Sequence, residues 1–179
     1  MPAVTVFCGS ASGLDPQFAA AADRLGEAFA ARGIELVYGG GRLGLMGRVA
    51  DACLGAGGRV VGIIPSFLRT REVDHSGVSE LIEVASMHER KQLMFERSDG
   101  FVVLPGGIGT LEETIEVLSW RHLGLHDKPI VLVDIAGYWS PLAALIEHLI
   151  TSGFAGATSR DRLAVARTIE AVFPALGFD

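Results

Sequence analysis

Residues 101–113 read FVVLPGGIGTLEE, which is a short apolar run, a glycine-rich turn and the acidic beginning of a segment with helical periodicity. Short apolar runs rich in valine are typical of strands buried on both faces of a parallel sheet. We expect the following helix to reach about Leu125. Its core-facing stripe should comprise Leu111, Ile115, Leu118 and His122. The stretch therefore predicts a buried strand, a glycine loop and a helix, in that order.

The same alternation of strand, loop and helix continues on both sides of this stretch. We expect the other strands at residues 4–7, 35–38, 60–64, 81–84, 130–133 and 163–166. Helices should cover residues 16–32, a segment ending near 55–58, then 87–98, 140–151 and a last segment from about 168. Such alternation is typical of α/β proteins. We predict one domain, residues 1–179, built on a doubly wound parallel sheet with helices on both faces.

Composition narrows the class of protein. The 179 residues carry 15 basic and 21 acidic side chains, a formal net charge of −6, which argues against nucleic acid and anionic membranes as partners. No apolar run approaches the ~18 residues that span a bilayer, and no basic leader precedes the first strand. Cys8 and Cys53 lack metal-ligand spacing, so we expect buried, reduced thiols. These features predict a cytoplasmic protein.

Three glycine-rich loops, at residues 9–13, 39–47 and 106–110, each follow a predicted strand. In open parallel sheets, ligands bind beyond the carboxyl ends of the strands. Glycine allows close approach to the backbone, and a helix N-terminus offers unpaired N–H groups to an anion. Each loop could instead make only a tight turn, but three at one sheet edge favour a ligand that bears phosphate.

Familiar nucleotide signatures fit these loops poorly. Gly39, Gly41 and Gly44 satisfy GxGxxG, yet the next strand ends in Pro65 without an acidic residue to hold a ribose. The phosphate-loop signature GxxxxGK[ST] does not occur, and the histidines show no metal-ligand spacing. We therefore predict neither a dinucleotide cofactor nor a metal.

Acidic residues follow the third loop. Glutamates in a first helical turn are often merely stabilised by the helix dipole. Here, however, Glu113 lies beside Glu116, and Glu112 shares a strip with Glu116 and Ser119, next to a loop that should hold an anion. A carboxylate near a bound phosphosugar can activate water and stabilise positive charge at the anomeric carbon. Glu113 is the first candidate for that role.

A charged run, MHERK, occupies residues 87–91. Its simplest interpretation is a solvated helix face, with His88 a surface or capping residue. The helix nevertheless begins at the same sheet edge as the glycine loops. Arg90 could therefore reach a phosphate or a ribose hydroxyl and keep a carboxylate ionised.

Together, MHERK at 87–91, PGGIGTLEE at 105–113 and the glycines of 39–47 resemble the LOG ("Lonely guy") family of cytokinin riboside 5'-monophosphate phosphoribohydrolases. The family pattern PGGxGTxxE is matched at every fixed position. The likeness covers essentially the whole chain, including Trp120 and the turn at 126–129. It implies a Rossmann-like homodimer that hydrolyses the N-glycosidic bond of N6-modified AMP, and often of AMP, to free base and ribose 5-phosphate.

The resemblance also implies roles for single residues. Arg90 and Glu113 correspond to the catalytic pair, and Gly107, Gly109 and Thr110 to the phosphate-binding loop. The substrate-binding set would comprise Glu72, Arg90, Lys91, Gly106, Gly107, Ile108, Gly109, Thr110, Leu111, Glu112, Glu116 and Ser119. Ser119 stands where relatives often have threonine, so the hydroxyl is kept. We predict no cofactor.

Two alternatives remain open at this point. Relatives have carried the label lysine decarboxylase, which would need a lysine for pyridoxal phosphate, and the chain has only Lys91 and Lys128. A carrier of a nucleotide or of the molybdenum cofactor would use the same glycine loops. The acidic residues beside the third loop favour turnover, because carboxylates repel a bound phosphate.

Overall fold

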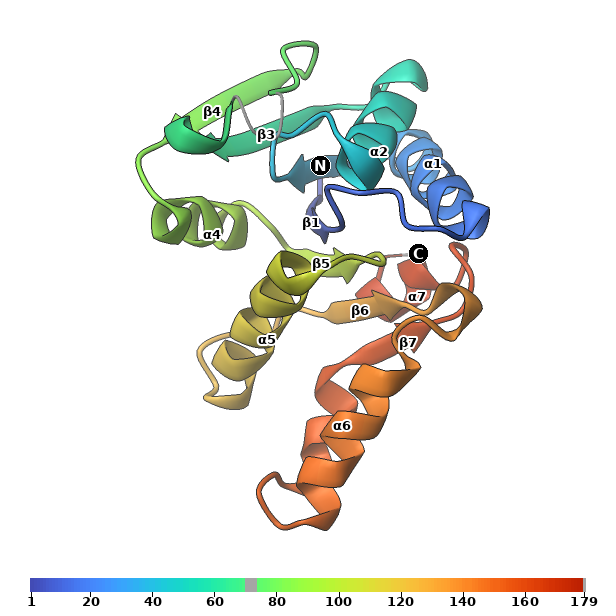
Figure 1. Cartoon of the computed structure of the whole chain (residues 1–179), viewed down its shortest axis with the longest axis vertical. Coiled ribbons are helices and arrows are strands. Elements are labelled where there is room, and N and C mark those ends of the chain that lie inside the picture. Colours follow the sequence, from blue (N-terminus) through green and yellow to red (C-terminus); the bar gives the residue numbers. More distant parts are fainter. Residues whose placement is uncertain (70–73, 179) are drawn as a thin grey trace.

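The computed structural model of the chain, shown in Figure 1, describes residues 1–69 and 74–178. Its centre is one parallel sheet of seven strands in the order β4-β3-β2-β1-β5-β6-β7. The strands are β1 (Ala3–Phe7), β2 (Glu35–Tyr38), β3 (Val60–Pro65), β4 (Glu80–Val84), β5 (Gly100–Val103), β6 (Ile130–Val133) and β7 (Ala164–Ala166). The predicted doubly wound α/β fold is confirmed.

Helices cover both faces of the sheet (Figure 1). One apolar cluster joins the sheet to α1 (Pro16–Ala31), α2 (Gly44–Gly55) and α7 (Val172–Leu176). A second joins the opposite face to α4 (Met87–Glu96), α5 (Ile108–His122) and α6 (Ser140–Thr151). Short 3-10 turns are η1 (Ser66–Leu68), η2 (Ile135–Gly137) and η3 (Ala157–Arg162). Alternate strand residues face the two clusters, as the two-residue period of a strand requires.

Two predictions about helices were wrong. The last helix begins at Val172 rather than near residue 168. The buried residues of α5 are Thr110, Thr114 and Val117, whereas Ile115 is 42% exposed. The stripe was misplaced because two threonines, rather than apolar residues, occupy part of the buried face of α5. The Thr114 hydroxyl can be buried there because it donates a hydrogen bond to the Thr110 carbonyl of the same helix, at 2.7 Å. Of the predicted stripe, Leu111 and Leu118 do pack against the core.

The strand order reverses between β1 and β5. From β1 the chain builds outward to β4 and then returns to β5 on the other side of β1. The loops after these two strands therefore leave in different directions and open a crevice, the usual ligand position in such sheets. A hydrogen bond from the Gly9 N–H to the Pro105 carbonyl, at 3.0 Å, joins the two loops at its floor.

Cys8 and Cys53 are buried cysteines outside any disulfide, as expected, and burial raises the pKa of the Cys53 thiol to about 11. In the part of the chain that the structure describes, none of the helices has the length and apolar character needed to cross a membrane.

Candidate active site

A cavity of about 250 Å³ lies at the strand-order reversal. It is lined from the end of β1, from α2, η1 and α4, and from the β5–α5 loop with the first turns of α5. Of the residues predicted for the site, it contains Arg90, Gly107, Ile108, Gly109, Thr110, Glu112 and Glu113. A hollow of similar size beside Arg24 and Arg167 has no carboxylate in its lining. The chemistry therefore favours the cavity at the β1–β5 crevice.

Arg90 is held in place by the ends of two strands. Its guanidinium donates from Nε to the Ile63 carbonyl at 3.1 Å and from Nη2 to the Gly39 carbonyl at 2.7 Å. The residue is 4% exposed, although it lines the cavity. A Cβ on Gly39 would lie 2.0 Å from Nη2, so the absence of a side chain there leaves room for the guanidinium. Arg90 thus presents a fixed cation to the cavity.

The first turn of α4 explains how Arg90 reaches this position. The Ser86 hydroxyl accepts a hydrogen bond from the Glu89 N–H at 3.1 Å, and the Glu89 carboxylate accepts one from the Ala85 N–H at 2.8 Å. Reciprocal caps of this kind determine where a helix begins. Arg90 follows directly and lies on the buried face of α4. His88 is exposed and does not line the cavity, in agreement with its interpretation as a surface residue.

The β5–α5 loop carries the features of an anion site. Gly107 caps α5 from an extended conformation, and no side chain among the described residues caps that helix. The N–H groups at its start are therefore open to a ligand. Thr110 is 4% exposed and packs on Gly106, where a Cβ would lie 2.1 Å from the Thr110 Oγ1.

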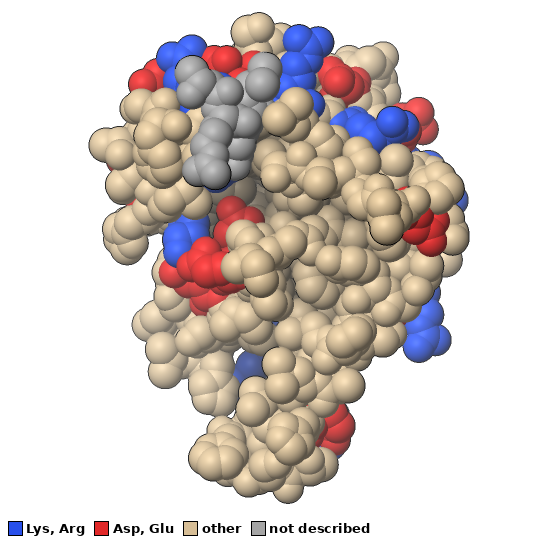
Figure 2. Space-filling model, in the orientation of Figure 1, with Lys and Arg blue, Asp and Glu red and all other residues tan. Residues whose placement is uncertain are grey.

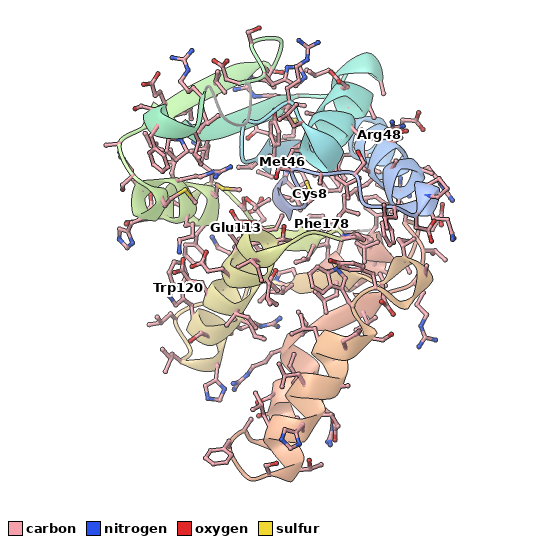
Figure 3. All side chains as sticks on the ribbon, viewed as in Figure 1. Cys8, Met46, Arg48, Glu113, Trp120 and Phe178 are labelled. Atoms are coloured by element: carbon pink, nitrogen blue, oxygen red, sulfur yellow. The ribbon has the colours of Figure 1, made fainter. Side chains whose placement is uncertain are left out.

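Glu113 projects from the second turn of α5 and is partly buried. Figure 3 labels Glu113 together with two other residues of the cavity lining. These are Cys8, which follows β1, and Met46, at the start of α2. All three line the cavity, as does Glu112. The cavity thus combines two carboxylates, a buried guanidinium and a helix N-terminus.

Lys91 lies behind the cavity and joins α4 to α5. Its ammonium donates to Glu112 at 2.5 Å and to Glu116 at 2.9 Å. Burial alone would lower the pKa of Lys91, but the two carboxylates outweigh it and raise the pKa above its usual value. Figure 2 shows acidic and basic groups side by side near the start of α5. Lys91 is thus a permanent cation that neutralises part of the acidic cluster.

Several predicted site residues do not reach the cavity. Lys91 and Glu116 form the ion pair behind it, Leu111 packs against the core and Gly106 supports Thr110. Ser119 lies in an apolar groove between α5 and α6, together with Ile115. Glu72 lies outside the described residues.

Sequence reasoning missed one wall of the cavity. Met46, Leu68 and Met87 line it together with Cys8. Cys8 follows β1 directly, Met46 lies in the glycine-rich segment 39–47 and Met87 begins the MHERK run, so each of these carried a usable signal. Nothing in the sequence singled out Leu68. This wall offers apolar and sulfur contacts to a flat ligand. Among the described residues, no group of three or more His, Cys, Asp and Glu side chains could hold a metal.

The family model described as "Possible lysine decarboxylase" matches residues 46–176. The chain is 48% identical to a cytokinin riboside 5'-monophosphate phosphoribohydrolase of Rhodococcoides fascians, over 97% of this chain and 88% of that protein. It is 45% identical to the cytokinin riboside 5'-monophosphate phosphoribohydrolase LOG1 of Arabidopsis thaliana, over 88% of this chain and 74% of that protein.

Solved structures share the fold at lower identity. The molybdenum cofactor binding protein of Rippkaea orientalis superposes with a TM-score of 0.73 at 24% identity, covering 97% of this chain and 93% of that one. The molybdenum cofactor carrier protein of Chlamydomonas reinhardtii gives 0.72 at 20% identity, covering 98% and 96%. At this identity the likeness extends to the fold alone.

Proposed function

Because the chain belongs to the LOG family of cytokinin riboside 5'-monophosphate phosphoribohydrolases, we propose that it hydrolyses the bond between base and ribose in these nucleotides. The substrates are N6-modified adenosine monophosphates and AMP itself, and the products are the free base and ribose 5-phosphate. One observation carries the proposal: the cavity brings a helix N-terminus, a buried arginine and carboxylates together. These are the groups that a phosphosugar undergoing hydrolysis needs.

The β5–α5 loop binds the 5'-phosphate. The first N–H groups of α5, from Gly107 onward, point beyond the helix start, and the positive end of the helix dipole favours an anion there. Thr110 adds a hydroxyl to the same part of the cavity. Fixing the phosphate holds the ribose within the cavity that the carboxylates also line.

Glu113 and Arg90 act at the ribose. The bond between C1' and the base nitrogen breaks with its electron pair on the base, and positive charge develops at C1'. The Glu113 carboxylate stabilises that charge and accepts a proton from the water whose oxygen bonds to C1'. Arg90 orients the ribose and keeps the carboxylate ionised. The base takes up one proton as it leaves, so the net reaction consumes one water.

The two lysines do not support the activity in the family label, lysine decarboxylase. Lys91 is a cation between two carboxylates, and the Lys128 ammonium donates to the Phe95 carbonyl at 2.6 Å. Neither lines the cavity. A Schiff base requires an uncharged amine at the site. A carrier function is likewise unsupported, because the carriers share only the fold with this chain.

The proposal also includes a cytoplasmic homodimer, as the family resemblance implies. An apolar groove between α5 and α6 is lined by Ile115, Leu118, Leu149 and Phe154, and Phe154 is 87% exposed. Figure 2 shows few charged atoms on the visible face around α6. Sedimentation of the purified chain tests the dimer.

The deciding experiment is an assay of free base released from isopentenyladenosine monophosphate and from AMP. Wild type should release base from both. Glu113→Gln should lower the rate by about 100-fold or more, the usual contribution of a general base. Glu27→Gln is the matched control, because Glu27 is an exposed carboxylate of α1 outside the cavity, and it should keep its rate within about threefold. Equal activity of Glu113→Gln and wild type would contradict the proposal.

A further inference from the structure

Tyr138 contacts the β5–α5 loop from outside the cavity. It directly follows η2, and its phenol donates a hydrogen bond to the carbonyl of Gly106. Tyr138 itself does not line the cavity. A residue after β6 thereby holds the backbone of the loop that precedes α5.

The turn that carries Tyr138 has an unusual backbone. Ala136 has φ 54° and ψ 26°, and it is the one non-glycine residue with positive φ in the described part of the chain. Gly137 follows with φ 74°. Left-handed backbone at a residue with a Cβ persists only where its surroundings impose it, and such positions concentrate at functional sites.

The surroundings do impose this turn. Asp134 is 7% exposed, and its carboxylate accepts hydrogen bonds from the Trp139 N–H at 2.7 Å and from the Ser140 hydroxyl at 3.3 Å. The Tyr138 ring packs edge-on against Phe18 at 5.3 Å and against Trp139 at 4.9 Å. The direction of the phenol is therefore set by packing, independently of its hydrogen bond to the loop.

Three successive carbonyls of the loop have donors from the protein. The Pro105 oxygen accepts from the Gly9 N–H at 3.0 Å, the Gly106 oxygen from Tyr138, and the Gly107 oxygen from the Leu111 N–H at 3.0 Å. In a planar trans peptide, the C=O of one residue and the N–H of the next point in opposite directions. The Gly107 N–H therefore points away from Tyr138.

The side of Gly107 facing away from the protein is open. A Cβ placed there would meet no atom of the described residues within 4 Å, and Gly107 lines the cavity. We infer that Tyr138 is a positioning residue for phosphate: by holding the Gly106 carbonyl, it directs the Gly107 N–H at the 5'-phosphate. This inference rests on the proposed function, since that function supplies the phosphate.

Tyr138→Phe tests the inference, because it removes the hydroxyl and keeps the ring. Calorimetric titration with inorganic phosphate and with ribose 5-phosphate should show about tenfold weaker binding than wild type, the size of one hydrogen bond to a charged group. KM for AMP should rise by a similar factor. kcat for AMP should stay within about twofold of wild type, because the groups at the ribose are unchanged. Thr151→Val is the control: it removes a hydroxyl that bonds within α6, outside the cavity, and it should bind phosphate as wild type does.

Several results would overturn the inference. One is phosphate binding by Tyr138→Phe that equals wild type. Another is a fall in kcat for AMP with KM and phosphate affinity unchanged, as a merely structural residue would give. A wild-type protein that binds no phosphate would overturn it as well. A wild type that binds phosphate yet releases no base would instead contradict the proposed function, while the titrations would still decide the role of Tyr138.

Discussion

Residues 39–47, the β2–α2 loop with the first residues of α2, and residues 105–110, the β5–α5 loop with the first residues of α5, look alike in sequence and differ in what occupies the space beside their glycines. In the first, a Cβ on Gly39, Gly44 or Gly47 would lie 2.0, 2.3 or 1.9 Å from other atoms of the protein. In the second, a Cβ on Gly107 or Gly109 would meet nothing within 4 Å among the described residues. Glycine content alone therefore does not identify a ligand loop; here it is open space combined with a place in the cavity lining that distinguishes Gly107 and Gly109.

The two loops have complementary roles in the site. None of the glycines of 39–47 lines the cavity, whereas Met46 of the same segment does. The glycines instead let the Gly39 carbonyl accept from Arg90, and the Gly40 carbonyl accepts from the His75 N–H at 3.0 Å. The β2–α2 loop thus supports the arginine, and the β5–α5 loop is left to meet the ligand.

The largest effect should come from Gly39→Ala. The new methyl group would displace the Arg90 guanidinium, lower the free energy of unfolding by about 1–3 kcal/mol and reduce base release by about 100-fold. Urea unfolding and the base-release assay measure the two effects. Gly55→Ala, at the end of α2 with open space beside it, is the control and should change neither. Wild-type activity in Gly39→Ala would show that this loop does not hold Arg90.

Gly107→Ala should separate stability from binding. Its backbone is extended, so alanine fits, and the free energy of unfolding should stay within about 0.5 kcal/mol of wild type. The methyl group would occupy the approach to the phosphate, so KM for AMP should rise about tenfold.

Gly106→Ala gives the contrast within the same loop. Its Cβ would collide with Thr110, so stability should fall. If Gly107→Ala left KM unchanged, the open space beside Gly107 would not be where the phosphate binds.

The smallest effect should be a change of stability with pH, through a histidine that contacts α5. His126 is buried; its Nε2 bonds to the Val117 carbonyl at 2.8 Å, and its Nδ1 accepts from the Lys128 N–H at 3.1 Å. Burial lowers the pKa of His126 below its usual value of about 6.5. The unfolded chain therefore takes up a proton first, and the free energy of unfolding should fall as pH drops through about 6.5.

The matched variant is His126→Asn, whose side-chain oxygen replaces the Nδ1 acceptor. Its stability should be lower at neutral pH, and its dependence on pH between 7 and 5 should be weaker than that of wild type. Titration of the His126 ring by NMR measures the pKa directly. A pKa above about 6.5 would contradict the prediction.

The sequence predicted best those strands whose side chains are buried on both faces of the sheet. Residues 35–38 and 130–133 are strands with the predicted limits, because apolar runs bounded by glycine or proline leave few other conformations. Ile115 was misplaced because apolar periodicity cannot distinguish the face of a helix that packs on the sheet from one that borders a groove.

The sequence by itself determined the strands, the glycine loops and the grouping of Arg90 and Glu113 near one sheet edge, because these follow from local periodicity and from parallel-sheet geometry. Only the tertiary structure decided which glycines face open space, that Arg90 is anchored on two strand ends, and that Tyr138 holds the Gly106 carbonyl. Each of these depends on contacts between segments distant in the chain. Such contacts arise when the sheet assembles, and no local pattern of residues encodes them.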